Sequence, residues 1–146
     1  MDLPINIFGA VAQEGEIYFF SENCPEGIPN HPHILVRKRG SYLFLNTCSS
    51  QLTTSIRLAT IRKWDVRTYP VIKKDATNML MKDSYVDCNK FVELSAQRFG
   101  ELLNSGMIRR DVGNGVVSES DIAMIREGIS LSVNISDEDK DRILGE

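Results

Sequence analysis

The sequence predicts an α+β domain, built on a small, strongly bent antiparallel sheet or barrel with helices on its C-terminal side. Short apolar and aromatic segments separated by turn residues fill the first two thirds of the chain, whereas serine-capped helical patterns come only after them. A length of 146 residues with 42% hydrophobic content suits one globular domain that buries a real core. We therefore expect strands first and helices last around one core.

Three strands are expected in the first third of the chain. Residues 16–20 are aromatic and β-branched, and the loop predicted at 21–30 has the Gly, Pro and Asn of turns. Residues 33–37 form the second strand, with Pro32 at its entrance, where a missing N–H does little harm. Residues 42–48 return as a near-continuous apolar run, which predicts a central strand buried on both faces.

Four further segments extend the predicted sheet. Residues 57–61 and 69–72 are the weaker strand candidates, and residues 85–89 and 91–94 are the stronger ones. Short strands at this spacing are typical of a small bent sheet or barrel.

Three helices are predicted from their capping residues. The hydroxyl of Ser95 can cap a helix that ends before Gly106. Ser118 or Ser120 can cap a second helix, and Ser136 can cap a third whose first turn is acidic.

The last quarter of the chain differs in character from the rest. It begins with a turn-rich stretch at 111–115 and is acidic afterwards, while Ile122, Ile125 and Ile129 have helical spacing. We expect residues 1–110 to form the barrel-like domain with its helix. Residues 111–146 are then an acidic helical extension docked on the same domain and close to its basic part.

Charge is strongly segregated along the chain, although the formal net charge is only -3. Residues 37–74 carry nine basic side chains against Asp65 alone, which makes this stretch +8. Such a stretch favours a polyanionic partner, while a solvated face neutralised by the acidic flanks is the alternative. Aromatic residues interleave with the basic ones around Trp64, a combination that holds single-stranded nucleic acid, although a lone Trp also suits a core.

Hydroxyl side chains gather directly after the predicted central strand. Hydroxyls supply the short hydrogen bonds that fix the place of a phosphate, so this cluster predicts an oxyanion-binding loop, with an ordinary surface turn as the alternative. The six residues are Thr47, Ser49, Ser50, Thr53, Thr54 and Ser55.

Several classes of function are not supported by the sequence. The three cysteines, Cys24, Cys48 and Cys88, are widely spaced without a C-x-x-C pair, which indicates neither a disulfide framework nor a zinc site. His31 and His33 lack a third ligand at useful spacing, so we expect no metal. Glycine patterns for nucleotide phosphates are absent, and we expect no cofactor.

Localisation follows from hydropathy. The N-terminus has no basic region before an apolar core, and no apolar run approaches the roughly 18 residues that cross a bilayer. We expect a cytoplasmic protein without membrane contact.

Three stretches, in order and spacing, resemble the MazF/PemK/Kid family of toxin endoribonucleases. Residues 15–19 (GEIYF) followed by a long loop and residues 31–36 (HPHILV) are similar to the opening of that family. Residues 48–51 (CSSQ) stand where the family has a Thr-Ser pair ending its third strand. Residues 80–90 (LMKDSYVDCNK) resemble the next characteristic segment of the family, which is a turn between two apolar strands. The resemblance spans roughly residues 13–105.

The resemblance implies an SH3-like barrel with a C-terminal helix, usually a homodimer whose groove takes single-stranded RNA and whose partner is an antitoxin protein. It also implies metal-independent cleavage, in which the 2′-hydroxyl of the substrate attacks its own phosphate. This agrees with the general physics of phosphoryl chemistry, which needs positioning and charge stabilisation more than a protein nucleophile.

The resemblance assigns roles to individual residues. His31 falls where the family commonly has an arginine, and a histidine can act as acid or base near neutral pH. Ser49 and Ser50 fall on the Thr-Ser pair. Asn89 falls on the position of the catalytic aspartate, and Asp87 falls where some members have an arginine. These departures put family-type cleavage in doubt.

The predicted site follows from these assignments. The residues predicted to carry catalysis are His31, Ser49, Asp87 and Asn89. The residues predicted to bind RNA are Ser50, Gln51, Arg39, Arg57, Arg62 and Lys63. Two alternatives stay open: the same barrel binding RNA or a protein partner without cleavage, and an interaction protein with no nucleic-acid role.

Overall fold

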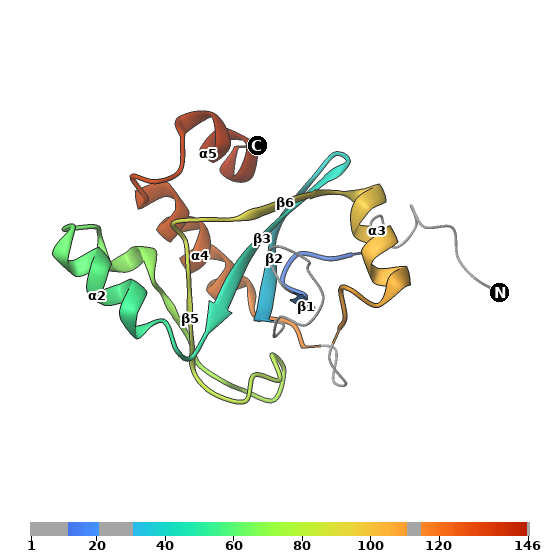
Figure 1. Cartoon of the computed structure of the whole chain (residues 1–146), viewed down its shortest axis with the longest axis horizontal. Helices are drawn as coiled ribbons and strands as arrows, with labels where there is room; N and C mark the ends of the chain where they lie inside the picture. The colour runs from blue at the N-terminus through green and yellow to red at the C-terminus, as the bar shows by residue number, and fades with distance from the viewer. Residues whose placement is uncertain (1–11, 21–30, 111–114, 146) are drawn as a thin grey trace.

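The computed structural model describes residues 12–20, 31–110 and 115–145. Within them the chain forms an α+β fold with a six-stranded antiparallel sheet and four α-helices (Figure 1), as the sequence predicts. The elements follow in the order β1 (Ile17–Phe20), β2 (His31–Arg39), β3 (Tyr42–Ser49), α2 (Thr53–Ile61), the 3-10 helix η1 (Val66–Thr68), β4 (Val71–Ile72), β5 (Ser84–Val86), β6 (Val92–Ser95), α3 (Ala96–Ser105), α4 (Glu119–Leu131) and α5 (Asp137–Leu144).

β3 is the centre of the sheet. It pairs with β2 along one edge, and on the other edge with β6 at its start and with β5 at its end. β4 then pairs with β5, and β1 pairs with β2. Two different partners along one edge require the sheet to bend, and a register shift between Leu35 and Arg37 of β2 adds to the bend. The predicted central strand is therefore confirmed.

The sheet does not close into a barrel within the described residues. Residues 115–117 lie across part of the open side instead. The Ile17 N–H donates to the Gly115 carbonyl, and the Val117 N–H donates to the Gly15 carbonyl. On the other side of this segment, the Val116 N–H donates to the Thr77 carbonyl in the loop after β4.

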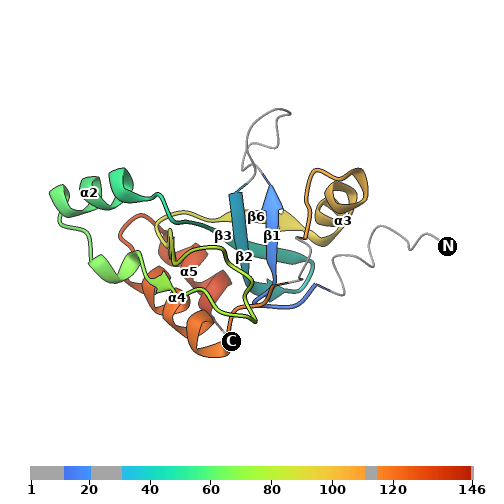
Figure 2. The same cartoon turned by 90° about the horizontal axis from the view of Figure 1, so that it is seen from below.

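Helices cover both faces of the sheet, so there are two hydrophobic clusters. Leu43 and Leu45 of β3 pack with Phe99 of α3, whereas Phe44 and Cys48 belong to the cluster that contains the isoleucines of α4 and α5. Figures 1 and 2 show α3 on one side of the sheet and the α4–α5 pair on the other. The alternation along β3 is the period of two that a strand imposes.

The predicted helix caps are confirmed. Ser95, Ser118 and Ser136 each precede a helix and accept a hydrogen bond from the backbone N–H three residues later. Gly106 ends α3 with a φ of 83°, in the left-handed region that glycine adopts without strain.

One element type was predicted wrongly. Residues 57–61, expected as a strand, belong to α2, which begins at Thr53 and so takes in half of the hydroxyl cluster. Only Ala59 of this helix is buried, and the helix has no side-chain cap at its N-terminus. Its β-branched residues favour a strand, while the usual helix signals, an apolar stripe and a capping residue, are missing. A local pattern therefore could not identify it.

The C-terminal helices are part of the main core. Ile122, Ile125 and Ile129 of α4 and Ile143 of α5 lie in the same cluster as Ile34 of β2. Their predicted boundary with the rest of the chain falls at residues 111–114, outside the described residues.

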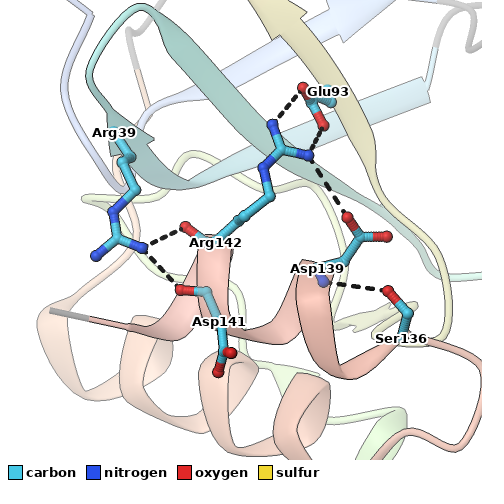
Figure 3. Close-up of polar contacts among 6 residues, drawn as sticks. All are labelled: Arg39, Glu93, Ser136, Asp139, Asp141 and Arg142. Carbon is cyan, nitrogen blue, oxygen red and sulfur yellow. Dashed lines mark hydrogen bonds and ion pairs between the residues drawn. The ribbon is translucent and has the colours of Figure 1, made fainter.

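Polar contacts fix α5 against the sheet (Figure 3). Arg142 forms a bidentate ion pair with Glu93 of β6, with Nη1 at 2.8 Å and Nη2 at 2.6 Å from its oxygens. The Arg142 guanidinium also lies over the rings of Tyr42 and Phe44, at 5.8 and 5.1 Å from their centroids. Arg39 of β2 donates to the backbone carbonyls of α5, including that of Asp141 at 2.7 Å.

We expect Gly128→Ala to lower the free energy of unfolding by about 1–3 kcal/mol, because a Cβ there overpacks the contact between α4 and η1. That Cβ would lie 2.7 Å from the Arg67 carbonyl oxygen and 2.7 Å from Cys88 Sγ. Urea denaturation followed by circular dichroism measures the change. The matched control is Ser130→Ala on an exposed position of the same helix. Equal stability of the two variants would contradict the tight contact.

Candidate functional site

A buried row of side chains crosses the sheet near the end of β3. His33 of β2 is the cross-strand partner of Thr47, and the Asp87 N–H donates to the Thr47 carbonyl at 3.0 Å from the other side. Cross-strand partners point to the same face of a sheet. All three residues are buried, and the His33 ring stacks on Phe20 with 3.8 Å between centroids. Asp87 therefore belongs to a buried row and is not accessible at the end of β3.

An outer row lies one step further along the same strands. Ser49, the last residue of β3, is paired with Tyr85 of β5. The pairing of β2 with β3 ends at His33 and Thr47, and His31 and Ser49 each lie two residues beyond that pair on the same face. His31 is exposed, and Ser49 and Tyr85 are half-buried. The outer row is therefore accessible and shares its face with the inner one.

Three of the four residues predicted for catalysis thus share one face of the sheet, namely His31, Ser49 and Asp87. Sequence reasoning missed Tyr85 as their neighbour. Only the pairing of β5 with the end of β3 brings Tyr85 beside Ser49. Nothing in the local sequence indicates that pairing.

The Ser49 hydroxyl has a defined local environment. Its Oγ accepts a hydrogen bond from the Gln51 N–H at 3.0 Å, a turn that fixes the side chain beside the strand end. Within the described part of the chain no acceptor takes the Ser49 hydroxyl proton, so the group can donate to a bound oxygen. Ser50 and Gln51 are exposed next to it.

A pocket of about 320 Å³ adjoins Ser49 and Ser50. Its apolar walls come from β1, from Pro32 at the start of β2 and from the loop before β5, while its polar part includes Lys82 and Ser84. The lining residues are Ile17, Phe19, Pro32, Ser49, Ser50, Asn78, Met79, Leu80, Met81, Lys82, Ser84 and Gly115. Sequence reasoning gave Lys82 no function. The structure brings it to the same pocket as two serines.

Asn89 does not join the two rows. Its Nδ2 donates to Thr68 Oγ1 of η1 at 3.0 Å, while its Oδ1 accepts from Ser132 Oγ at 2.6 Å and from Asn134 Nδ2 at 3.1 Å. Its backbone N–H also donates to Asp87 Oδ1 at 2.9 Å. These bonds use both ends of the amide to connect η1 with the segment between α4 and α5. Asn89 therefore has a structural role that the sequence did not indicate.

Burial shifts the pKa of one further polar group beside Asp87. The Tyr69 hydroxyl has its pKa raised, first by burial and next by the negative charge of Asp87. The phenol therefore stays protonated at neutral pH.

The basic residues predicted to bind RNA are distributed over different elements. Arg39 is engaged with the carbonyls of α5, at the opposite end of β3 from Ser49. Arg57 lies one turn into α2, while Arg62 and Lys63 lie at its far end. The +8 stretch of sequence therefore does not line one continuous groove. Arg57 is the first cation in the chain after β3, and Lys82 lines the pocket next to Ser49.

Metal and thiol chemistry find no support in the described residues. No group of three His, Cys, Asp or Glu side chains there could hold a metal ion. Burial raises the pKa of the Cys48 thiol to about 12 and also raises the pKa of Cys88. Both are therefore neutral thiols at physiological pH. Among the described helices, none is long and apolar enough to cross a bilayer.

We expect Asn89→Ala to lower the free energy of unfolding by about 2–4 kcal/mol, because it leaves the buried hydroxyls of Thr68 and Ser132 without this partner. Chemical denaturation measures the effect. Asn104→Ala on the exposed side of α3 is the matched control and should change stability by less than about 0.5 kcal/mol. A stable Asn89→Ala protein would contradict the structural role.

We expect a Cys24→Ser protein to react with Ellman's reagent at pH 8 only after unfolding. Cys24 lies outside the described residues, so its replacement leaves Cys48 and Cys88 as the thiols observed. With a pKa of about 12, Cys48 is a thiolate in only about one molecule in ten thousand at that pH. Rapid release of the chromophore from the folded protein would show that a thiol is accessible and reactive.

The chain was compared with known proteins. A scan against protein families found no match, and a search of curated proteins found no relative. The resemblance to toxin endoribonucleases therefore rests on the quoted stretches alone and stays a prediction.

Proposed function

We propose that this chain is a toxin-like endoribonuclease that binds single-stranded RNA at the outer row and cleaves it without a metal ion. The observation that carries the proposal is the pairing of His33 with Thr47, because His31 and Ser49 each lie two residues beyond that pair, on the same face and at the accessible end of β3. An acid–base group and a hydroxyl donor side by side are what transfer of an RNA phosphate within its own chain requires.

The chemistry is an attack of the ribose 2′-oxygen on the adjacent phosphorus. The neutral His31 imidazole accepts the 2′-hydroxyl proton as the O2′–P bond forms. The P–O5′ bond then breaks, and the leaving 5′-oxygen takes a proton from solvent or from the imidazolium. The products are a 2′,3′-cyclic phosphate and a 5′-hydroxyl. Ser49 donates a hydrogen bond to a phosphate oxygen as charge develops there.

The surroundings of the outer row supply binding contacts. Lys82 and Ser50 line the adjoining pocket, so a phosphate at Ser49 has a cation and a second hydroxyl close by. The pocket walls from Phe19 and Pro32 lie on the other face of β1 and β2 from His31, so an unstacked base reaches them only around the end of the sheet. Arg57, one turn into α2, adds a further exposed positive charge in the chain that follows Ser50. Single-stranded RNA fits this combination better than a duplex, whose bases are not exposed.

The open side of the sheet supports the further proposal that the fold is a divergent SH3-like barrel. Residues 115–117 hydrogen-bond to β1 on one side and to the loop after β4 on the other, which is the gap that closure of a barrel would fill. A homodimer and an antitoxin partner follow from the resemblance and belong to the same proposal, as does the cytoplasmic location that the hydropathy of the sequence predicts.

A second candidate function is RNA binding without cleavage at the same row. Two observations favour it. Asn89, at the position expected for an acid, is held by η1 and by the segment after α4. Arg39 is held by α5. Binding alone needs neither residue in the row.

The test is incubation of the purified protein with a labelled single-stranded RNA in the presence of EDTA. We expect cleavage with a cyclic phosphate product, at least 100-fold slower for His31→Ala and at least tenfold slower for Ser49→Ala. Ser105→Ala in α3 is the matched control and should cleave at the wild-type rate. A 2′-deoxy substitution at the cleaved nucleotide should abolish the reaction.

Two results would decide against cleavage. Salt-sensitive RNA binding without product selects the second candidate, because phosphate contacts release counterions. Neither binding nor product at low salt rejects both functions.

A further inference from the structure

α2 projects from the body of the molecule. Figures 1 and 2 both show it at the outer edge, beyond β5 and away from the sheet. Only Ala59 of its nine residues is buried. A short helix with one buried residue has little packing of its own to stabilise it, since helical stability in proteins comes mostly from packing of an apolar face. Its remaining apolar side chains therefore need another explanation.

Those apolar side chains face solvent together. Leu58 and Ile61 are 44% and 70% exposed and are three residues apart, which places them on one side of the helix. Val66 is 75% exposed at the start of η1, directly after the turn that ends α2. Single exposed aliphatic residues are common, whereas these three lie on α2 and at the start of the next element, at the projecting part of the molecule, and form a candidate interaction surface. We call Leu58, Ile61, Arg62, Lys63 and Val66 the α2 tip.

The charge at the α2 tip is positive. Arg62 and Lys63 are exposed there, and no acidic side chain of the described residues forms an ion pair with either. The nearest carboxylate along the chain, that of Asp65, is bound by Arg67 at 2.8 Å, and this bond lowers the pKa of Asp65. The Asp65 carboxylate is therefore paired with Arg67 and does not neutralise the charges of Arg62 and Lys63. The surface complements an acidic rim around an apolar centre.

The tip is held in one shape before any partner arrives. The Trp64 N–H donates to the Ala59 carbonyl at 2.9 Å and the Lys63 N–H to the Thr60 carbonyl at 3.1 Å, with Lys63 at a φ of 60°. These two bonds form a Schellman motif, which closes a helix end. Arg62 lies over the half-buried Trp64 ring at 5.2 Å and adds a cation–π contact. A preformed surface loses little conformational entropy on binding.

The aliphatic side chains of the α2 tip favour a protein partner over single-stranded RNA. Bases of single-stranded RNA stack on aromatic rings or on arginine planes, whereas Leu, Ile and Val contribute by removing apolar surface from water. At the α2 tip the aromatic ring of Trp64 is already covered by Arg62. Leu58, Ile61 and Val66 therefore suit the apolar face of an amphipathic helix, and the two cations suit carboxylates beside that face.

We propose that the α2 tip is a docking surface for an acidic, amphipathic segment of a partner protein. The partner segment presents aliphatic side chains at helical spacing to Leu58, Ile61 and Val66, and carboxylates to Arg62 and Lys63. This inference does not depend on RNA cleavage, because the outer row and its pocket contain none of these five residues.

The test uses a short fluorescein-labelled helical peptide with leucines at i, i+3, i+4 and i+7 and glutamates elsewhere, followed by fluorescence anisotropy. We expect the full chain to bind it, and the double variant Leu58→Ser, Ile61→Ser to bind at least tenfold more weakly. Arg62→Gln with Lys63→Gln should weaken binding and reduce its salt dependence. Met107→Ser with Val133→Ser, two exposed apolar positions elsewhere, is the matched control and should bind like wild type.

Several results would overturn the proposal. Equal binding by the Leu58→Ser, Ile61→Ser protein, or equal binding of a peptide with lysines in place of glutamates, would show that the tip does not select this chemistry. A concentration-dependent dimer that this double variant abolishes would assign the tip to a second copy of the chain. A matching loss of RNA affinity in the same variant would assign it to RNA. Circular dichroism of each variant confirms that it is folded.

Discussion

The structure depends on β3 being hydrogen-bonded along both edges and covered on both faces. The buried backbone groups of this strand need protein partners in place of water, so β2, β5 and β6 must each pair with it in the correct register. That requirement fixes the position of Ser49 at the end of β3 and the side chains that lie opposite it. The outer row is thus a consequence of sheet pairing rather than of a loop, and residues on paired strands hold their positions better than loop residues do.

Polar contacts link this sheet to the chain that follows it. Asn89 joins η1 to the segment between α4 and α5, while Arg39 and Arg142 hold α5 against β2 and β6. These contacts tie residues that are far apart in sequence, and the isoleucines of α4 and α5 add apolar burial beneath them. The described part of the acidic C-terminal region, α4 and α5, is therefore a component of the core.

The features that the sequence predicted well are those set by local chemistry. The apolar run at 42–48 and the caps Ser95, Ser118 and Ser136 each act within a few residues, so a single sequence reveals them. α2 was missed because it has β-branched residues, no capping side chain and one buried residue. The role of Asn89 and the approach of Lys82 to the serines depend on long-range packing, which no local pattern encodes.

The hydroxyl cluster shows how one stretch of sequence divides between two surfaces. Thr47, Ser49 and the neighbouring Ser50 stay with the sheet, where pairing or the pocket orients them. Thr53 and the residues after it enter α2, which leads away from the sheet and has Arg57 along it and Arg62 and Lys63 at its end. Charge that is contiguous in sequence is therefore separated in space. The end of β3 offers hydroxyls with Lys82 in the adjoining pocket, whereas the far end of α2 offers aliphatic side chains beside two cations, and these are different chemistries of recognition.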